Sequence, residues 1–463
     1  MTRRTRREGK MGLLFFPAFD WAISPTHPER EERLLYTKDQ IVEEGVLDLD
    51  EIVEYAPRIA QDVDIARVHF CVPDVAAQAT EAHRIAVGGA LTLADAWMAG
   101  EIANGFAIIR PPGHHAMRVA HGNRGFCNVH NEAAMVAYLR QKYGLRRVAI
   151  VDTDVHHGDG TQEIFYHDPD VLVIGLHQDG RTLYPGSGFV DELGGPGAFA
   201  RNLNVPLPPG TTDEGVHYVI ENFVLPVLAD FEPEIVVNSA GQDNHYSDPL
   251  ANMRVSAQGY AHLNERLAPD LAVLEGGYSI QSALPYVNLG IILAMAGLDY
   301  AHVREPDYVP EKLRQSQAQW DVIRQTVDLL LDIWQRPESA FAQVYPHLED
   351  IYTREKPIFY DTDGIREHQE ETVRVCEACP GWLHIDSRAQ GGHFGRRRIW
   401  AISIPWAACE RCAEEARAQY QAMARNPTAP YDWLYLQDRP ADEYRRYSPS
   451  TEREDVLLTC PPP

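Results

Sequence analysis

The sequence predicts an α/β fold in which helices cover both faces of a parallel β-sheet, followed by a smaller cysteine-containing module. Short apolar runs of strand length alternate with longer amphipathic stretches up to about residue 300, a pattern typical of βαβ units. Polar or glycine-rich segments follow directly after these runs, and in a parallel sheet they gather at the carboxyl edge, where ligands bind. The chain has 463 residues, of which 44% are apolar, so we expect two domains and a substantial core.

Five apolar runs have the length of buried strands. In chain order they are Phe106–Ile109, Val148–Val151, Val171–Leu176, Ile235–Asn238 and Leu271–Leu274. The sequence predicts helices over Asn131–Gln141, over Asp213–Leu228 and over residues 311–335, where apolar residues from Leu313 to Trp334 recur near helical spacing. Pro337 ends this last helix. The composition then changes, so we expect one domain over residues 1–345 and a second over residues 346–463.

The segment Asp152–Gly160 follows the predicted strand Val148–Val151 and carries three carboxylates and two imidazoles. In an extended backbone Asp152, Asp154 and His156 lie on one side, so Asp154 and His156 can bind the same divalent ion. A catalytic zinc ion takes three protein ligands. Asp243 is the best-placed third ligand, because Asp248 lies further into its loop. The alternative is a solvated acidic loop with incidental histidines.

Two histidines and a tyrosine add acid–base chemistry to this group. His114 and His115 follow a Pro-Pro-Gly turn, which makes a rigid platform for a general base and a general acid. Catalytic imidazoles need an acceptor on the far nitrogen, and Asp152 and Asp159 are available for that purpose. Tyr278 could donate its hydroxyl to a developing oxyanion. Together these residues predict zinc-assisted amide hydrolysis.

Six motifs resemble the zinc-dependent histone deacetylase and acetylpolyamine amidohydrolase family over roughly residues 10–300. They are RPPGHHA (110–116), GFC (125–127), DTDVHHGDG (152–160), YPGSG (184–188), GQD with DPL (241–250) and LEGGY (274–278). The resemblance implies the arginase–deacetylase fold, a three-layer α/β sandwich with a parallel sheet. Arginases and agmatinases share this fold but use two manganese ions and a DAHxD stretch, whereas this chain has DxDxHHG and the histidine pair, so a single zinc ion is preferred.

The resemblance also implies a role for each matching residue. Asp154, His156 and Asp243 match the zinc ligands, and Tyr278 matches the tyrosine that polarises the substrate carbonyl. His114 pairs with Asp152 and His115 with Asp159, the second histidine being the main base and acid. The substrate tunnel matches Phe126, Tyr184 (usually Phe), Leu250 and Gly277. A potassium ion would take Asp152, Asp154, His156 and Leu176, with glycine at position 175 where the family often has serine.

Three further features of the family resemblance bear on the substrate and on the shape of the site. Leu250 matches the apolar gatekeeper of protein deacylases, which favours acyl-lysine in proteins or peptides over acetylpolyamines. A domain that binds acyl-lysine but has lost catalysis is a further alternative, which the complete set of catalytic residues opposes. The segment Met117–Arg124 is expected to shape the pocket rim. His130 stands where the family usually has Asn, and we expect it to be structural.

Four of the seven cysteines form two CxxC pairs, Cys376 with Cys379 and Cys409 with Cys412, separated by residues 380–408. Two such turns can close a four-cysteine site, so we expect a structural zinc ion in a zinc-ribbon-like module. Unliganded or redox-active thiols are the alternative, but the thioredoxin-like context is missing. Support of folding or of a homo-oligomer is the expected role of this module.

Composition limits the partners. A net charge of −25 argues against nucleic-acid binding, which depends on a positive field. Residues 1–10 are basic without an apolar core, so they do not resemble a secretory signal, and no apolar run is long enough to span a membrane. Scattered cysteines do not indicate a disulfide framework. We therefore expect a cytoplasmic protein.

Overall fold

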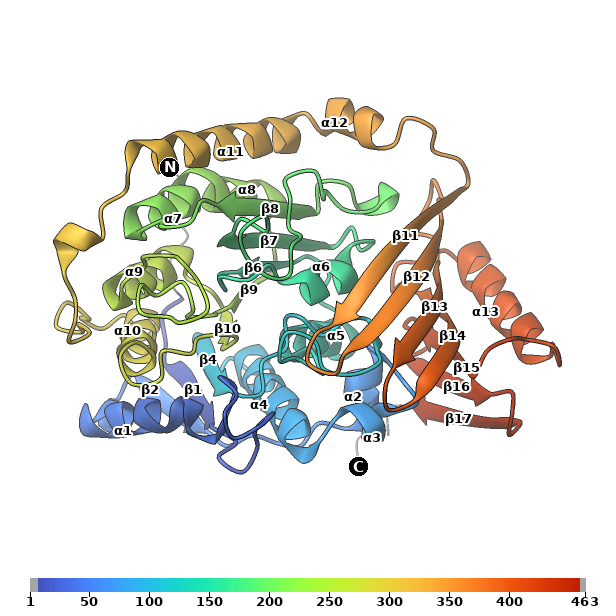
Figure 1. Cartoon of the computed structure of the whole chain (residues 1–463), viewed down its shortest axis with the longest axis horizontal. Coiled ribbons are helices and arrows are strands. Elements are labelled where there is room, and N and C mark those ends of the chain that lie inside the picture. Colours follow the sequence, from blue (N-terminus) through green and yellow to red (C-terminus); the bar gives the residue numbers. More distant parts are fainter. Residues whose placement is uncertain (1–6, 459–463) are drawn as a thin grey trace.

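The computed structural model describes residues 7–458 and contains two large sheets, coloured from blue to yellow and from orange to red in Figure 1. Residues 1–6 of the basic amino-terminal segment and Cys460 lie outside this range. The first sheet has eight parallel strands in the order β2-β1-β4-β10-β9-β6-β7-β8. The strands are β1 (Met11–Phe16), β2 (Ile52–Tyr55), β4 (Asn104–Ile109), β6 (Val148–Asp152), β7 (Val171–Gln178), β8 (Asn202–Leu207), β9 (Ile235–Ser239) and β10 (Leu271–Val273).

All five predicted strands are present, in β4, β6, β7, β9 and β10, and the predicted parallel sheet is confirmed. The sequence did not predict β1, β2 and β8. β2 has only four residues, and β8 (NLNVPL) interrupts its apolar residues with asparagine and proline. Short or polar-interrupted runs lack the periodicity by which a strand is found.

Helices pack on both faces of this sheet because successive strand residues point to opposite sides. In β4, Phe106 and Ile108 belong to one core and Ala107 and Ile109 to the other. The first core is closed by α1 (Leu35–Glu43), α7 (Asp213–Val219), α8 (Leu225–Phe231), α9 (Ala257–Leu267), α10 (Leu284–Ala296) and α11 (Gln317–Gln335). The second is closed by α2 (Asp62–Ala66), α4 (Glu81–Met98), α5 (Asn131–Tyr143) and α6 (Asp159–Phe165). The result is the predicted three-layer sandwich.

Two of the predicted helices differ in detail. The helix predicted over Asp213–Leu228 contains a π-helical turn at Ile220–Val224, between α7 and α8. The helix predicted from residue 311 begins only at Gln317, after a 3-10 turn at Pro310–Lys312. Ser316 explains the later start: its hydroxyl accepts a hydrogen bond from the backbone N–H of Gln319, whose side chain accepts one from the backbone N–H of Ser316.

The second sheet is larger than a zinc ribbon requires. Seven strands follow one another in chain order, and all neighbours are antiparallel except β14 and β15, which are parallel and joined through α13 (Glu410–Ala424). The strands are β11 (Ile351–Tyr360), β12 (Ile365–Arg374), β13 (Leu383–Gly391), β14 (Gly395–Ile404), β15 (Trp433–Asp438), β16 (Glu443–Ser448) and β17 (Arg453–Leu458). The short helix α12 (Pro337–Val344) precedes them. The division at residue 345 stays a prediction.

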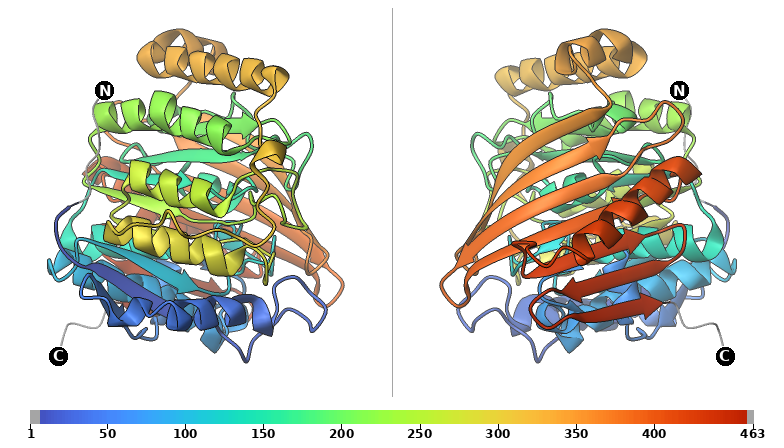
Figure 2. Two further views of the ribbon diagram at one scale, coloured as in Figure 1. Left: turned by 90° about the vertical axis from the view of Figure 1, so that its left-hand side faces the viewer. Right: turned by 90° about the vertical axis from the view of Figure 1, so that its right-hand side faces the viewer.

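One face of the second sheet packs on the first domain, and α13 lies on the other face, toward the viewer in the right panel of Figure 2. The contact contains Phe70 of β3 (Phe70–Cys71) and Val119 of β5 (Val119–Ala120), packed on apolar residues of β12 to β15. Every residue of the segment Met117–Arg124 is buried, and none of them lines the cavity described below, whose wall resumes at Gly125. The predicted contribution of this segment to the pocket rim is therefore not found. Among the described residues, no helix combines the length and apolar character needed to cross a membrane.

Candidate active site

The strand order brings the predicted site residues together. β4, β10, β9 and β6 are consecutive neighbours in the first sheet, and all four run in the same direction. The loops that leave their carboxyl ends carry the histidine pair, Tyr278, Asp243 and the segment Asp152–Gly160, respectively. These loops therefore converge at one edge of the sheet, as expected for a doubly wound α/β fold.

Asp154, His156 and Asp243 form one potential metal site. Their ligand atoms all lie within 4.8 Å of one another. His156 Nδ1 is 3.1 Å from both Asp154 Oδ1 and Asp243 Oδ2. Both carboxylates are fully buried, and burial together with the charge of Asp154 raises the pKa of Asp243. Two buried carboxylates side by side need a compensating cation, so this donor set fits a divalent metal ion.

Two glycines allow the backbone to approach these carboxylates. A Cβ atom at Gly241 would lie 2.0 Å from Asp154 Oδ2, and one at Gly276 would lie 2.1 Å from Asp243 Oδ2. The backbone N–H of Gly276 instead donates to Asp154 Oδ2 at 2.7 Å. Val155 N–H donates to Asp243 Oδ1 at 2.9 Å. Both carboxylates are thus held in place by backbone N–H groups.

The two histidines have the predicted carboxylate partners. His114 Nδ1 lies 3.1 Å from Asp152 Oδ2, and His115 Nδ1 lies 2.8 Å from Asp159 Oδ1. Burial opposes the charged form of His114, but the carboxylates of Asp154 and Asp152 outweigh burial and raise its pKa well above the usual value. Burial, reinforced by the charge of His114, lowers the pKa of His115 well below the usual value. Two adjacent imidazoles thus have opposite protonation preferences.

Buried polar side chains hold the turn that carries the histidines. The backbone N–H groups of Gly113 and His114 donate to Glu275 Oε2 at 2.7 and 2.9 Å. Arg110 Nε donates to Glu29 Oε1 at 2.7 Å, and Arg33 Nη1 donates to Glu29 Oε2 at 2.8 Å. Sequence reasoning missed Glu29 and Arg33, because they lie just before and within a single 3-10 turn (Glu31–Leu34) that carries no motif. Together these contacts make the turn rigid.

Tyr278 is fixed by a neighbouring aspartate. Its backbone N–H donates to Asp248 Oδ2 at 2.7 Å, while Leu250 N–H donates to Asp248 Oδ1 at 2.9 Å. Burial and the charge of Asp243 raise the pKa of Asp248 to about 7. Asp248 is not part of the Asp154 metal group. It orients Tyr278 and Leu250 instead, a task that sequence reasoning did not assign to it.

A cavity of about 200 Å³ opens onto these residues. It is lined by Pro112, His114, His115, Gly125, Phe126, His156, Leu183, Tyr184, Leu250, Tyr278 and Asp361. The predicted tunnel residues Phe126, Tyr184 and Leu250 are therefore on its wall. Gly277 is not; it has φ +122°, and its carbonyl accepts a hydrogen bond from Arg33 Nε at 2.8 Å. Asp361 comes from the turn between β11 and β12, and no sequence argument pointed to it.

Arg124 is a further residue that sequence reasoning missed. Its Nη2 lies 2.6 Å from Asp159 Oδ2, so it shares this carboxylate with His115. Its Nη1 donates to the Tyr184 hydroxyl at 2.8 Å. The tyrosine at position 184, where the family usually has phenylalanine, thus has a partner for its hydroxyl. In the sequence, the tyrosine at position 184 was the one feature that pointed to such a hydrogen-bond partner.

The remaining predicted histidines have structural contacts. His157 Nδ1 lies 2.8 Å from Ser187 Oγ, and its Nε2 lies 3.1 Å from Gln162 Oε1. His130 precedes α5, and its Nδ1 accepts a hydrogen bond from Ala133 N–H at 3.2 Å, as an N-cap does. Burial lowers the pKa of His157 to about 4 and that of His130 to about 3. Both histidines are therefore neutral near pH 7.

The residues of the predicted potassium site come from two paired strands and one loop: Asp152 ends β6, Asp154 and His156 follow it in the loop, and Leu176 lies in β7. Asp152 of β6 is the register partner of Gly175 in β7, and Leu176 follows in the same strand. Asp152 Oδ1 already accepts a hydrogen bond from Asp154 N–H at 3.1 Å. Potassium binding stays a prediction.

Cys376, Cys379, Cys409 and Cys412 form a second potential metal site, with sulfur atoms within 4.8 Å of one another. The first pair lies between β12 and β13, whereas Cys409 precedes α13 and Cys412 lies in its first turn. The two pairs are joined by the β13–β14 hairpin. Four convergent thiols on two turns are the donor set of a structural zinc ion.

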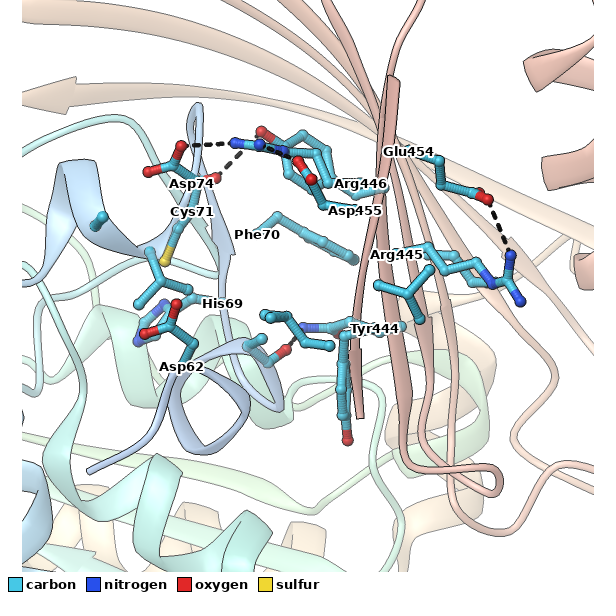
Figure 3. Close-up of a pocket in the computed structure, with 18 of the residues that line it drawn as sticks. Asp62, His69, Phe70, Cys71, Asp74, Tyr444, Arg445, Arg446, Glu454 and Asp455 are labelled. Atoms are coloured by element: carbon cyan, nitrogen blue, oxygen red, sulfur yellow. Dashed lines mark hydrogen bonds and ion pairs between the residues drawn. The ribbon is translucent and has the colours of Figure 1, made fainter. Parts of the chain in front are cut away.

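A larger cavity of about 480 Å³ contains none of the predicted site residues. It lies between β15–β17 and the segment from α2 to α3 (Val75–Gln78) (Figure 3). Its charged side chains pair with each other: Arg446 Nη1 lies 2.7 Å from Asp74 Oδ2, and Arg445 Nη1 lies 3.1 Å from Glu454 Oε2. Burial raises the pKa of the Cys71 thiol there. We therefore place the active site in the smaller cavity.

Comparison with known proteins shows the family to which the chain is similar. Residues 73–289 match the histone deacetylase domain family. A probable deacetylase of Archaeoglobus fulgidus is 41% identical over 356 residues, covering 71% of this chain and 92% of that protein. The acetoin utilization protein AcuC of Bacillus subtilis is 31% identical over 341 residues, covering 65% of this chain and 86% of that protein. The solved HD domain of HDA15 superposes with a TM-score of 0.62 at 28% identity, covering 74% of this chain and 99% of that one.

Three convergent potential metal ligands beside two His–Asp pairs are typical of metal-dependent hydrolases. With the identity and coverage of these relatives, the chain belongs to the histone deacetylase family. It is a deacetylase, a hydrolase that acts on amide C–N bonds. The predictions of family, fold and enzyme class are confirmed, whereas the roles of individual residues and the substrate stay predictions.

Proposed function

We propose that the chain removes acetyl or other acyl groups from lysine side chains of proteins or peptides. The observation that carries this proposal is one cavity whose walls are Phe126, Tyr184 and Leu250 and which also contacts both histidines, His156 and Tyr278. Aromatic and aliphatic walls suit the straight alkyl chain of an acyl-lysine. The polar residues in the same cavity suit hydrolysis of the amide.

A zinc ion held by Asp154, His156 and Asp243 would supply Lewis-acid polarisation of the acyl carbonyl and activation of a water molecule. His115, which its lowered pKa keeps neutral, accepts a proton from the attacking water and returns it to the departing lysine amine. Asp159 fixes the tautomer of His115 by accepting from Nδ1. The carboxylates of Asp154 and Asp152 favour the charged form of His114, which would stabilise negative charge, while the Tyr278 hydroxyl donates to the oxyanion.

Acetylated polyamines are a second candidate substrate. Asp361 places a carboxylate on the cavity, where it could pair with the second ammonium group of a polyamine. Leu250, also on the cavity wall, opposes this reading because it offers no partner to a cation. Relative turnover of acyl-lysine peptides and of acetylated polyamines would decide between these substrates.

Single-turnover hydrolysis of a fluorogenic acetyl-lysine peptide tests the proposal. We expect hydrolysis that a chelator abolishes and that added zinc restores. A zinc-loaded chain that binds the acyl-peptide without hydrolysing it would overturn the proposal and favour the binding module.

We further propose a structural zinc ion at the four cysteines and a cytoplasmic location. Zinc content and cell fractionation would check these two points.

A further inference from the structure

The turn between β11 and β12 reaches the active-site cavity, although both strands belong to the second sheet. In Figure 1 these strands run from the upper right down to the teal segment near α5. Asp361 directly follows β11 and is a wall residue of the cavity. It is partly buried there. The second sheet therefore contributes a carboxylate to a site whose other residues come from the first domain.

One contact links Asp361 to the backbone that carries the cavity wall. Asp361 Oδ1 accepts a hydrogen bond from Gly125 N–H at 2.9 Å. Gly125 has φ +53°, and a Cβ atom at this position would lie 2.4 Å from Cδ2 of His115. The backbone of Gly125 thus packs directly on the imidazole. By holding this backbone, Asp361 limits the positions open to His115.

A second contact runs through side chains. Asp361 Oδ1 accepts the hydrogen of the Tyr184 hydroxyl at 2.8 Å. Because a hydroxyl has one hydrogen, this donation leaves its oxygen free to accept from Arg124 Nη1 at 2.8 Å. Arg124 Nη2 in turn lies 2.6 Å from Asp159 Oδ2, and Asp159 Oδ1 holds His115. Charge-assisted hydrogen bonds of this kind are short and directional. The position of Asp361 therefore restricts the position of His115 through this series of contacts.

We propose that Asp361 is a positioning residue of the deacetylase site, which fixes the Tyr184 wall and the Arg124–Asp159–His115 arrangement from the second sheet. The inference rests on the proposed function, because it assigns to the C-terminal module a part in the geometry of that same site. It also gives Tyr184 a reason to differ from phenylalanine: its hydroxyl joins Asp361 to Arg124.

A double-mutant cycle in the full-length chain tests this role. Asp361→Ala and Tyr184→Phe are compared singly and together for kcat/KM on an acetyl-lysine peptide. We expect Asp361→Ala to lower kcat/KM by about ten- to a hundredfold, since small displacements of catalytic groups have effects of this size. In the Tyr184→Phe background the same change should cost several-fold less, because coupled residues are not additive. Equal effects in both backgrounds would overturn the proposal.

The matched control is Asp363→Ala. Asp363 lies in the same turn, and its Oδ2 accepts from Asn123 N–H at 2.7 Å, but it is not a wall residue of the cavity. We expect the kcat/KM of Asp363→Ala to stay within about twofold of the wild-type value, because substitutions of exposed surface residues usually have small effects. KM separates positioning from partial unfolding, because it does not depend on the fraction of active enzyme. KM should rise in Asp361→Ala and not in Asp363→Ala.

A binding measurement distinguishes failure of the positioning role from failure of the proposed function. Fluorescence anisotropy gives the Kd of the acetyl-lysine peptide. If the wild type binds the peptide without hydrolysing it, the proposed function fails. The double-mutant cycle is then evaluated with Kd in place of kcat/KM. Asp361→Ala should then weaken binding several-fold, and less so in the Tyr184→Phe background. Active wild type with an unaffected Asp361→Ala variant would overturn the positioning role alone.

Discussion

Asp159 divides its carboxylate between His115, whose Nδ1 lies 2.8 Å from Oδ1, and Arg124, whose Nη2 lies 2.6 Å from Oδ2. The other pair differs. Asp152 Oδ2 holds His114, while Asp152 Oδ1 accepts a backbone N–H, that of Asp154. Arg124 thus adds a positive charge beside the Asp159–His115 pair, and in the described part of the chain it contacts neither residue of the Asp152–His114 pair. Arg124 is accordingly among the groups that lower the pKa of His115, after burial and the neighbouring histidines His114 and His156.

Replacing Arg124 with methionine should move the pH profile of the enzyme. His115 must be neutral to accept a proton, so activity falls as pH drops through its pKa. Removing the positive charge raises that pKa. The acidic limb of kcat/KM should therefore shift to higher pH, as measured with an acetyl-lysine peptide across the pH range.

Arg124→Lys serves as the control for charge. Lysine keeps the positive charge but cannot contact Asp159 and Tyr184 with the same planar fork. Its acidic limb should stay near that of the wild type, even if kcat falls. An acidic limb that does not move in Arg124→Met, or that moves to lower pH, would show that Arg124 does not influence the protonation of His115.

Tyr278→Phe should lower kcat with little change in KM. The hydroxyl has its largest effect on the oxyanion of the transition state, and removing one such donor costs on the order of 10²- to 10³-fold. The ring would remain in place, because it packs on Phe126 with 5.5 Å between ring centroids. Steady-state kinetics on the acetyl-lysine peptide give both parameters.

Tyr435→Phe removes an equally buried hydroxyl far from the reaction. That hydroxyl donates to the carbonyl of Pro73 at 2.9 Å, across the contact between the two sheets. We expect turnover to persist in this variant. Wild-type kcat in Tyr278→Phe would exclude oxyanion stabilisation by Tyr278.

The catalytic loops could be predicted from the sequence because each one directly follows an apolar strand. Once the sheet is parallel, its topology brings those loops together without further information. Asp361 could not be predicted in this way. It lies between β11 and β12, outside every motif, and it reaches the cavity only because the second sheet packs over residues 117–124.

The second sheet itself also escaped prediction, for a reason visible in β12. Its inward-facing residues include Glu367, Gln369 and Glu371, all of which are buried. Tyr360 donates to Glu367 Oε2 at 2.8 Å, and Lys356 lies 2.8 Å from Glu371 Oε1. Because polar residues occupy the buried face, the alternation that marks a half-buried strand does not appear in the sequence.

Cys409→Ser should remove one zinc ion and destabilise the C-terminal module. Cys409 lies at the start of α13, whose Cys412 and Ala416 are buried against the second sheet. Losing one thiolate opens the four-cysteine site and frees the end of that helix. Metal analysis should fall from about two zinc ions per chain to about one, and Tm should decrease.

Cys71→Ala provides the comparison, because Cys71 is a free buried cysteine outside both metal groups. Its zinc content should equal that of the wild type. If Cys409→Ser retained both zinc ions, the four cysteines would not be a zinc site. A redox role would then be supported by reversible oxidation of the CxxC pairs.

Substitutions of His130 should separate its capping role from a catalytic one. Its Nδ1 caps α5, and its Nε2 lies 2.8 Å from Thr161 Oγ1. Asparagine also caps helices well, whereas alanine does not. His130→Asn should therefore be more stable than His130→Ala by about 1 kcal/mol in urea unfolding monitored by circular dichroism. Both variants should keep the wild-type KM for the acetyl-lysine peptide, since His130 does not line the cavity. Equal stability of the two variants would show that the cap contributes nothing, and a changed KM would give His130 a part in the site.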